Sequence, residues 1–138
     1  MKLRLAGLLA FALIAASCSG NVFDLAVGDC FDDPDNFEEI SDVPMVECSA
    51  PHHNEVYFTY DLQGGSFPGL QAIEEAADTD CYERFESFVG MDYASSELDY
   101  GYLYPTSDTW SEGDREVVCL VYHMTGEKVT GSQRNAGI

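Results

Sequence analysis

REVVCLVYH, residues 115–123, is apolar over most of its length. One side of this stretch, as an extended chain, carries Val117, Cys119 and Val121, and the other carries Val118, Leu120 and Tyr122. A half-exposed strand would alternate apolar with polar residues, so a continuous apolar run indicates a strand buried on both faces. We therefore expect this segment to be the central strand of a sheet.

The segment Leu70–Val89 has the pattern of one long helix. Its apolar residues recur at helical spacing and form a single stripe of Leu70, Ile73, Ala77, Cys81, Phe85 and Phe88. Pro68 suits the start of such a helix and Gly90 suits its C-terminal stop. The stripe is expected to pack on one face of the sheet.

The remaining strands are expected at residues 23–27, 43–48, 55–62 and 98–104. In the last of these, alternation places Leu98, Tyr100, Tyr102 and Tyr104 on one face. Strands, then one helix, then strands predict an α+β fold: a small, mainly antiparallel sheet with one long helix packed on a face. Residues 125–138 are rich in Gly, Ser and Asn and weakly patterned, which predicts a flexible tail.

Length and charge restrict the class of protein. The chain has 138 residues, which fits one folded domain, and its formal net charge is −19. Phosphates would be repelled by such a surface, so nucleic acid is excluded as a partner. The charge itself indicates a soluble, repulsive surface before it indicates any function.

Residues 1–17 have the pattern of an export leader. Lys2 and Arg4 form its basic end, and an apolar stretch too short to span a bilayer stably follows over residues 5–16. The sequence AASC, residues 15–18, resembles a bacterial lipobox, which implies cleavage before Cys18 and lipid on Cys18. The alternative is an ordinary leader that leaves Cys18 free or removes it. With lipid, residues 18–27 would be a lipidated tether and first strand on the outer face of the cell membrane.

The cysteine count supports this interpretation. Of five cysteines, only Cys18 lies outside the patterned region, which leaves Cys30, Cys48, Cys81 and Cys119 to pair. Four cysteines allow three connectivities, so the sequence alone leaves the pairing open. We favour two disulfides, Cys30–Cys48 and Cys81–Cys119, as expected of an exported chain. A zinc site is disfavoured because no C-x₂₋₄-C spacing occurs.

A series of short motifs then points to a family. They are Gly28-Asp29-Cys30-Phe31, Cys48-Ser49-Ala50-Pro51-His52 with Glu55, Phe88-Val89-Gly90, Tyr104-Pro105-Thr106, Trp110, Gly113-Asp114-Arg115 and Cys119-Leu120-Val121-Tyr122. Together these resemble the septum-formation domain family of actinobacterial envelope proteins. The resemblance implies a domain over residues 28–124 and a link to septa or cell-wall machinery, and it implies no catalytic residue. The motif residues that we expect to be structural or binding are Pro51, His52, Glu55, Tyr104, Pro105, Trp110, Asp114 and Arg115.

His52 and His53 are the most conspicuous candidates for chemistry. Adjacent residues of an extended chain point in opposite directions, so the two rings are not expected to share one ion. We interpret His52 as a turn histidine that bonds to the backbone, with support from Glu55. The alternative is an enzyme acting on cell-wall material through His52 and nearby carboxylates, which requires His52 to be exposed in a cleft.

Three further groups of residues carry weaker signals. The acidic loop, residues 32–39, offers oxygen ligands for a weak calcium site, although it lacks the EF-hand pattern. Trp110 and the tyrosines of residues 98–104 form either an aromatic binding face for glycan or protein, or part of the core. Asp114 and Arg115, with Arg84, are expected to form a structural ion pair.

These observations favour a non-enzymatic, lipid-anchored envelope lipoprotein without a cofactor. Its membrane contact would be the lipid on Cys18, and its partner an envelope protein or cell-wall glycan. The alternatives are the His52 enzyme and a calcium-stabilised structural domain.

Overall fold

The computed structural model describes residues 18–36 and 40–138. The predicted leader, residues 1–17, and residues 37–39 of the acidic loop lie outside this range. The strands are β1 (Ser19–Asn21), β2 (Cys30–Phe31), β3 (Asp42–Val46), β4 (Asn54–Asp61), β5 (Leu98–Leu103) and β6 (Glu116–His123). The α-helices are α1 (Leu70–Val89) and α2 (Ser107–Ser111), and short 3₁₀ turns lie at Val22–Asp24 and Tyr93–Ser95. Within the described ranges, no helix has the length and apolar character needed to cross a bilayer.

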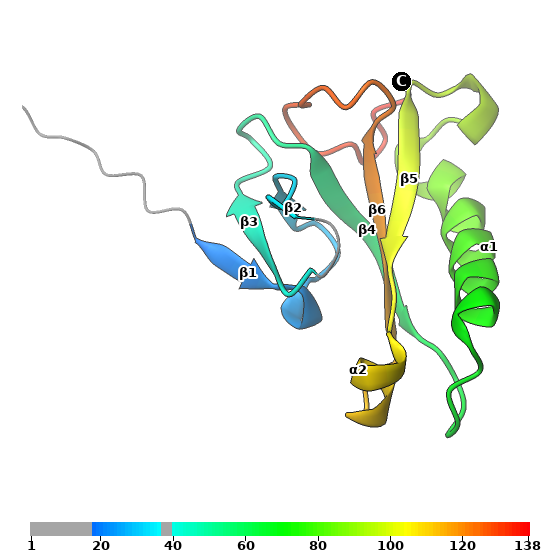
Figure 1. The fold of residues 1–138 in the computed structure, drawn as a ribbon. Helices are drawn as coiled ribbons and strands as arrows, with labels where there is room; N and C mark the ends of the chain where they lie inside the picture. Colours follow the sequence, from blue (N-terminus) through cyan, green and yellow to red (C-terminus); the bar gives the residue numbers. More distant parts are fainter. Residues whose placement is uncertain (1–17, 37–39) are drawn as a thin grey trace, which may run out of the picture.

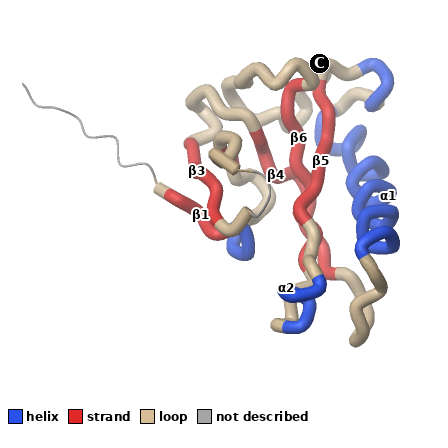
Figure 2. Tube along the Cα trace, in the orientation of Figure 1, coloured by secondary structure: helices blue, strands red, loops and turns tan. Residues whose placement is uncertain are grey.

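The strands form one antiparallel sheet in the order β1-β3-β2-β4-β6-β5. In Figure 1, α1 covers one side of β4, β6 and β5, and the small β1–β3–β2 part lies on the other side. The molecule thus has three layers, which Figure 2 shows by colour: helix α1, then the strands β4, β6 and β5, then the strands of the β1–β3–β2 part. The α+β fold predicted from the sequence is therefore confirmed.

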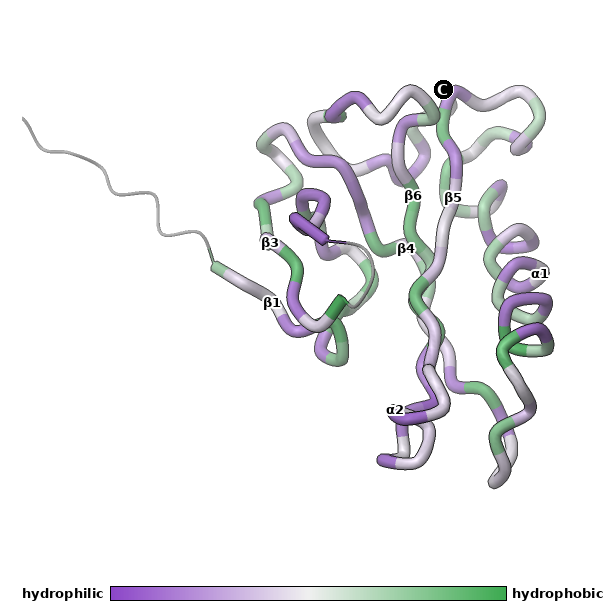
Figure 3. Tube along the Cα trace, viewed as in Figure 1, coloured by the Kyte–Doolittle hydropathy of each residue, from purple (hydrophilic) through white to green (hydrophobic). Residues whose placement is uncertain are grey.

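Strand β6 is an interior strand, as its apolar run predicts, although it lies one place from the edge of the sheet and not at its centre. It pairs with β4 on one side and β5 on the other. Val117, Cys119 and Val121 belong to the core beneath α1, and Val118 and Leu120 belong to the core on the opposite face. Figure 3 shows β6 as one of the most hydrophobic stretches, whereas α1 is hydrophilic mainly on the side that faces away from the sheet. Both faces of the strand are buried because each has its own apolar layer.

Helix α1 has the predicted bounds, and most of its apolar stripe is buried. Ile73, Ala77, Cys81, Phe85, Phe88 and Val89 are buried, and Gly90 ends the helix in the left-handed conformation, with φ 81°. Leu70 was expected on the stripe, but its side chain is 50% exposed because it lies in the first turn, beyond the buried part of the stripe. The Cys81–Cys119 disulfide joins the helix to β6, as expected.

The β1–β3–β2 layer is held together by the other disulfide. Cys30–Cys48 joins β2 to the chain just after β3, which is the second expected pair. Phe31 and Val43 from this layer pack with Val56 of β4 in the core on this face. Val56 faces this layer, and a bulge in β4 at Tyr57 lets both Tyr57 and Phe58 pack toward α1.

The N-terminal part differs from the prediction. The first strand was expected at residues 23–27, after a free tether, but residues 19–21 form the strand and Phe23 lies in a 3₁₀ turn. The side chain of Asn21 accepts a hydrogen bond from the amide of Phe23, which starts the turn and ends the strand. The apolar residues of this stretch pack as a turn: Val22 and Leu25 are buried, whereas Phe23 is 53% exposed.

The structure also contradicts the flexible tail predicted for residues 125–138. This segment returns across the end of the sheet, and His52 and Val129 exchange two backbone hydrogen bonds of 2.9 Å. Further on, the amide of Asn135 donates to the carbonyl of Phe88 and that of Gly137 to the carbonyl of Val89. The segment is fixed mainly by backbone groups, which a Gly- and Ser-rich sequence can supply without any apolar periodicity.

Candidate functional site

His52 is a buried structural histidine. Its exposed fraction is 0%, and its Nδ1 lies 2.8 Å from the carbonyl oxygen of Ala50 in the same turn. Nε2 is buried without a hydrogen-bonding partner among the described residues. The backbone contact expected for this turn is present. The enzyme alternative requires an exposed imidazole in a cleft, and His52 does not provide one.

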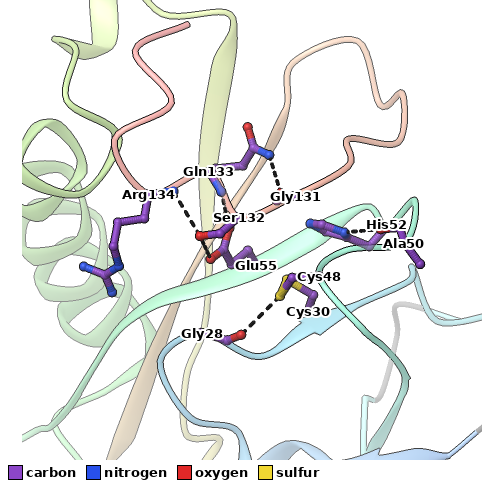
Figure 4. The surroundings of a disulfide bond; sticks show 10 residues. All are labelled: Gly28, Cys30, Cys48, Ala50, His52, Glu55, Gly131, Ser132, Gln133 and Arg134. Carbon is purple, nitrogen blue, oxygen red and sulfur yellow. Dashed lines mark hydrogen bonds between the residues drawn. A yellow bond between two sulfur atoms is a disulfide. The ribbon is translucent and has the colours of Figure 1, made fainter.

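Glu55 does not support His52 but holds the C-terminal segment. Its exposed fraction is 1%, and its two carboxylate oxygens each accept a hydrogen bond of 2.6 Å, from the hydroxyl of Ser132 and the amide of Gln133. Figure 4 shows this carboxylate pointing at the returning chain, with the Cys30–Cys48 disulfide beside it. Sequence reasoning missed this contact because the two sides are 77 and 78 residues apart. Its only signal was a Glu at the start of a strand rich in aromatic and β-branched residues.

The ligand-type atoms of Cys30, Cys48 and Glu55 lie within 4.8 Å of one another. This arrangement is not a metal site in the oxidised protein, because both sulfurs are held in the disulfide and are not thiolate ligands. Both oxygens of Glu55 are already hydrogen-bonded. No other group of this kind occurs in the described parts of the chain.

Trp110 closes one end of the sheet. It is 4% exposed, its indole N–H donates to the carbonyl of Gly65, and Phe67 contacts it edge-on with ring centroids 5.8 Å apart. The guanidinium of Arg115 lies over the indole, 3.7 Å from its centroid. Thr106 caps α2, which carries the tryptophan. Trp110 is therefore a core residue and not part of an exposed aromatic face.

The ion pair expected between Arg115 and Asp114 is absent. Arg115 Nη1 donates to the backbone carbonyls of Trp110 and Asp114, and its Nε donates to that of Gly64. The side chain of Asp114 instead accepts a hydrogen bond from the amide of Glu116. Backbone carbonyls and the indole ring satisfy this guanidinium, so the prediction of a carboxylate partner was wrong.

Arg84, the third member of the expected ion pair, lies elsewhere. Its guanidinium packs over the ring of Phe58, 4.8 Å from the centroid. It sits on α1, whereas Asp114 precedes β6, so the two residues belong to different parts of the fold.

The tyrosines of β5 and the one that follows it are half-buried and lie on the side of the sheet that faces α1. Tyr100, Tyr102 and Tyr104 all pack against the core beneath α1, as their shared face predicts. The hydroxyl of Tyr100 donates to Asp78 and that of Tyr104 to Glu74, both on α1. Burial and the Asp78 carboxylate raise the pKa of Tyr100, and Glu74 raises the pKa of Tyr104. Pro105, which follows Tyr104, is buried.

Two carboxylates of the acidic loop, those of Asp32 and Asp33, are already paired with protein groups. Asp32 contacts Lys128 Nζ at 2.7 Å and His53 Nδ1 at 3.1 Å, and Asp33 accepts a hydrogen bond from the side-chain amide of Asn54. Burial alone would raise the pKa of Asp32, but Lys128 and His53 outweigh it and hold the pKa below its usual value. A calcium ion would have to displace these contacts before it could use Asp32 or Asp33.

We therefore expect chelation to leave the stability of the protein unchanged. A ligand that binds the folded state raises the melting temperature, so a resident calcium ion would reveal itself when it is removed. Thermal unfolding should be followed by circular dichroism with excess EDTA and then with excess calcium. A melting temperature that falls in EDTA and recovers with calcium would contradict this expectation and restore the calcium-stabilised alternative.

Cys18 is the one cysteine without a disulfide, and its residue is exposed. Its backbone carbonyl accepts a hydrogen bond of 3.0 Å from the amide of Met45 in β3. The next residues form β1, which pairs with β3. The expected tether is thus replaced by a strand, so Cys18 leads directly into the folded domain.

Comparison with known proteins gives a family but no individual relative. No curated protein matches the chain, and no solved structure matches it. One family model, described as septum formation, matches residues 27–137. The match extends through the C-terminal segment that Glu55 holds, well past the end at residue 124 expected from the sequence. Since the match spans most of the chain, this protein belongs to the septum-formation family.

Proposed function

We propose that this chain is a non-enzymatic envelope lipoprotein, anchored through lipid on Cys18, whose domain binds a protein of the division or cell-wall machinery outside the membrane. The observation that carries the proposal is the position of Cys18. It is an exposed, unpaired cysteine at the start of the folded domain, directly after a leader-like segment. The other four cysteines are joined in disulfides, so Cys18 is the residue left for modification.

The disulfides favour a location outside the cytoplasm. Two bridges in a small domain are typical of exported proteins, because cytosolic thiols are kept reduced. Family membership favours a role at the septum or in the envelope. The buried position of His52 removes the residue on which the enzymatic alternative depended. A binding module is the function that remains with support from both the sequence and the geometry.

The proposal predicts a partner whose capture depends on the anchor. Intact cells producing the wild-type protein or Cys18→Ala should be crosslinked and lysed, and equal amounts of the two proteins should be isolated from the whole lysate. We expect one envelope protein to recur with the wild type and to be strongly reduced with Cys18→Ala, because anchoring concentrates both proteins at one surface. Equal recovery with both forms would argue against an anchored module, and recovery of wall glycan alone would identify a different partner class.

A further inference from the structure

An apolar groove lies on the face of the sheet opposite α1. Its volume is about 390 Å³, within the range of small-molecule sites. Its floor comes from β5 and β6 and its far wall from the β1–β3–β2 layer. Its apolar lining includes Phe31, Ile40, Val43, Leu103, Leu120 and Tyr122. This layer covers only part of the face, so Leu103 and Tyr122 beside it are half-buried, whereas Leu120 is buried.

A second hollow beside this groove is lined by Cys18. It has a volume of about 360 Å³, and Cys18 and Ser19 line it together with residues of the acidic loop and β3. Pro34, Ile40 and Val43 line both hollows. The two hollows therefore adjoin at these three residues, with Cys18 lining the second hollow and the apolar side chains of β5 and β6 lining the first.

The chain holds Cys18 in this place. Strand β1 pairs with β3 through three residues, and the carbonyl of Cys18 adds a hydrogen bond to Met45. Gly20 lies so close to Met45 that a β-carbon on it would be 2.6 Å from that side chain. Only glycine permits this close approach without displacing Met45. Any group attached to the sulfur of Cys18 thus starts at the second hollow.

We propose that the groove holds an acyl chain of the lipid carried by Cys18. This inference rests on the proposed lipidation. A long acyl chain matches the groove in its apolar character, and its attachment point lines the hollow that adjoins the groove. Acidic groups at the rim, such as Asp33 and Glu127, do not oppose an uncharged chain, whereas they would repel an acidic ligand.

The arrangement has a consequence for anchoring. Membrane attachment by lipid strengthens with each chain that enters the bilayer, and a single chain gives only marginal binding. A chain sheltered in the groove is withdrawn from the bilayer, so the domain is held more weakly than the number of chains on Cys18 would indicate. The β1–β3 side of the domain would also face the membrane, since Cys18 has no free tether.

The test is to supply cells with a photoreactive fatty acid that carries a diazirine on its chain. After irradiation, the full-length protein is isolated and digested, and its peptides are analysed by mass spectrometry. We expect label on the peptide that begins at Cys18, and a crosslink from that lipid to peptides containing Leu103 or Leu120. Label on Cys18 with crosslinks only to bilayer lipid would overturn the groove while leaving the lipoprotein proposal intact. Absence of label from Cys18 would overturn both.

Variants make the result specific to the groove. Leu103→Glu should lower the yield of groove crosslinks about tenfold or more. An ionised carboxylate would lose its hydration if an acyl chain covered it, and the free energy of that loss corresponds to more than a tenfold fall in the occupancy of the groove. Ile40→Glu tests the opposite wall in case Leu103→Glu reduces the melting temperature. Leu70→Glu is the matched control, since Leu70 is an exposed leucine on α1, on the other side of the sheet. Equal crosslinking in all three variants would refute the groove as the site.

A phospholipid attached to groove peptides would also overturn the proposal, because the chain would then come from the bilayer and not from Cys18.

Discussion

Replacing both Cys81 and Cys119 with alanine is expected to lower the free energy of unfolding by ~4 kcal/mol. The disulfide closes a loop with a sequence separation of 38, and the loop-entropy relation gives about this value for that length. Both residues are 0% exposed, so the lost sulfurs also remove packing between α1 and β6. A loss of this size is a large part of the ~5–15 kcal/mol that stabilises a typical domain.

The other disulfide provides the comparison. Cys30→Ala with Cys48→Ala opens a loop with a separation of 18, for which the same relation gives ~3 kcal/mol. Urea unfolding of the two double variants and the wild type, without reductant, gives the three free energies. Strain in the folded state can reduce such gains, so the order of the two losses is the informative quantity. A loss below ~1 kcal/mol on removing Cys81–Cys119 would show that the helix is held to β6 by packing alone.

The elements predicted well from sequence are those whose side chains repeat with a fixed period. The apolar run of β6 and the helical stripe of α1 each encode which faces are buried, so a local pattern carries long-range information. Tyr100, Tyr102 and Tyr104 follow the same logic, since alternation alone places them on the face toward α1. The sequence alone allows three pairings of the four cysteines. The fold contains the pairing in which Cys81, on the apolar stripe of α1, is joined to Cys119 of β6.

The elements that the sequence did not reveal are fixed by backbone groups or by single side chains. Strand β1 has three residues, too few for any periodicity, and pairs through its backbone with β3. The C-terminal segment is fixed by backbone hydrogen bonds from Val129, Asn135 and Gly137 and by the carboxylate of Glu55. Arg115 is a side chain whose partners could not be predicted in the same way. The sequence indicates that its guanidinium needs hydrogen-bond acceptors, but it does not indicate that backbone carbonyls will be those acceptors.

The last prediction concerns the contact between Glu55 and the C-terminal segment. Glu55→Leu should lower the free energy of unfolding by ~3–5 kcal/mol, because it removes two hydrogen bonds to a charged acceptor and leaves the amide of Gln133 buried without a partner. Glu55→Gln should cost only ~1–2 kcal/mol. Its amide oxygen can still accept from Gln133 and its NH₂ can donate to the hydroxyl of Ser132, at the strength of a neutral pair.

This graded series separates a specific contact from general loss of packing. Ser132→Ala removes one of the two bonds and should resemble Glu55→Gln, while Glu75→Gln, on the exposed face of α1, should change stability by less than ~0.5 kcal/mol. Thermal and urea unfolding give the free energies. Hydrogen exchange at Val129 and Asn135 reports whether the segment detaches before the sheet unfolds. If Glu55→Leu unfolds like the wild type and both amides stay protected, the backbone bridge to His52 holds the segment without Glu55. If exchange rises at these amides in Glu55→Leu and Ser132→Ala, the buried carboxylate joins residues 125–138 to the domain.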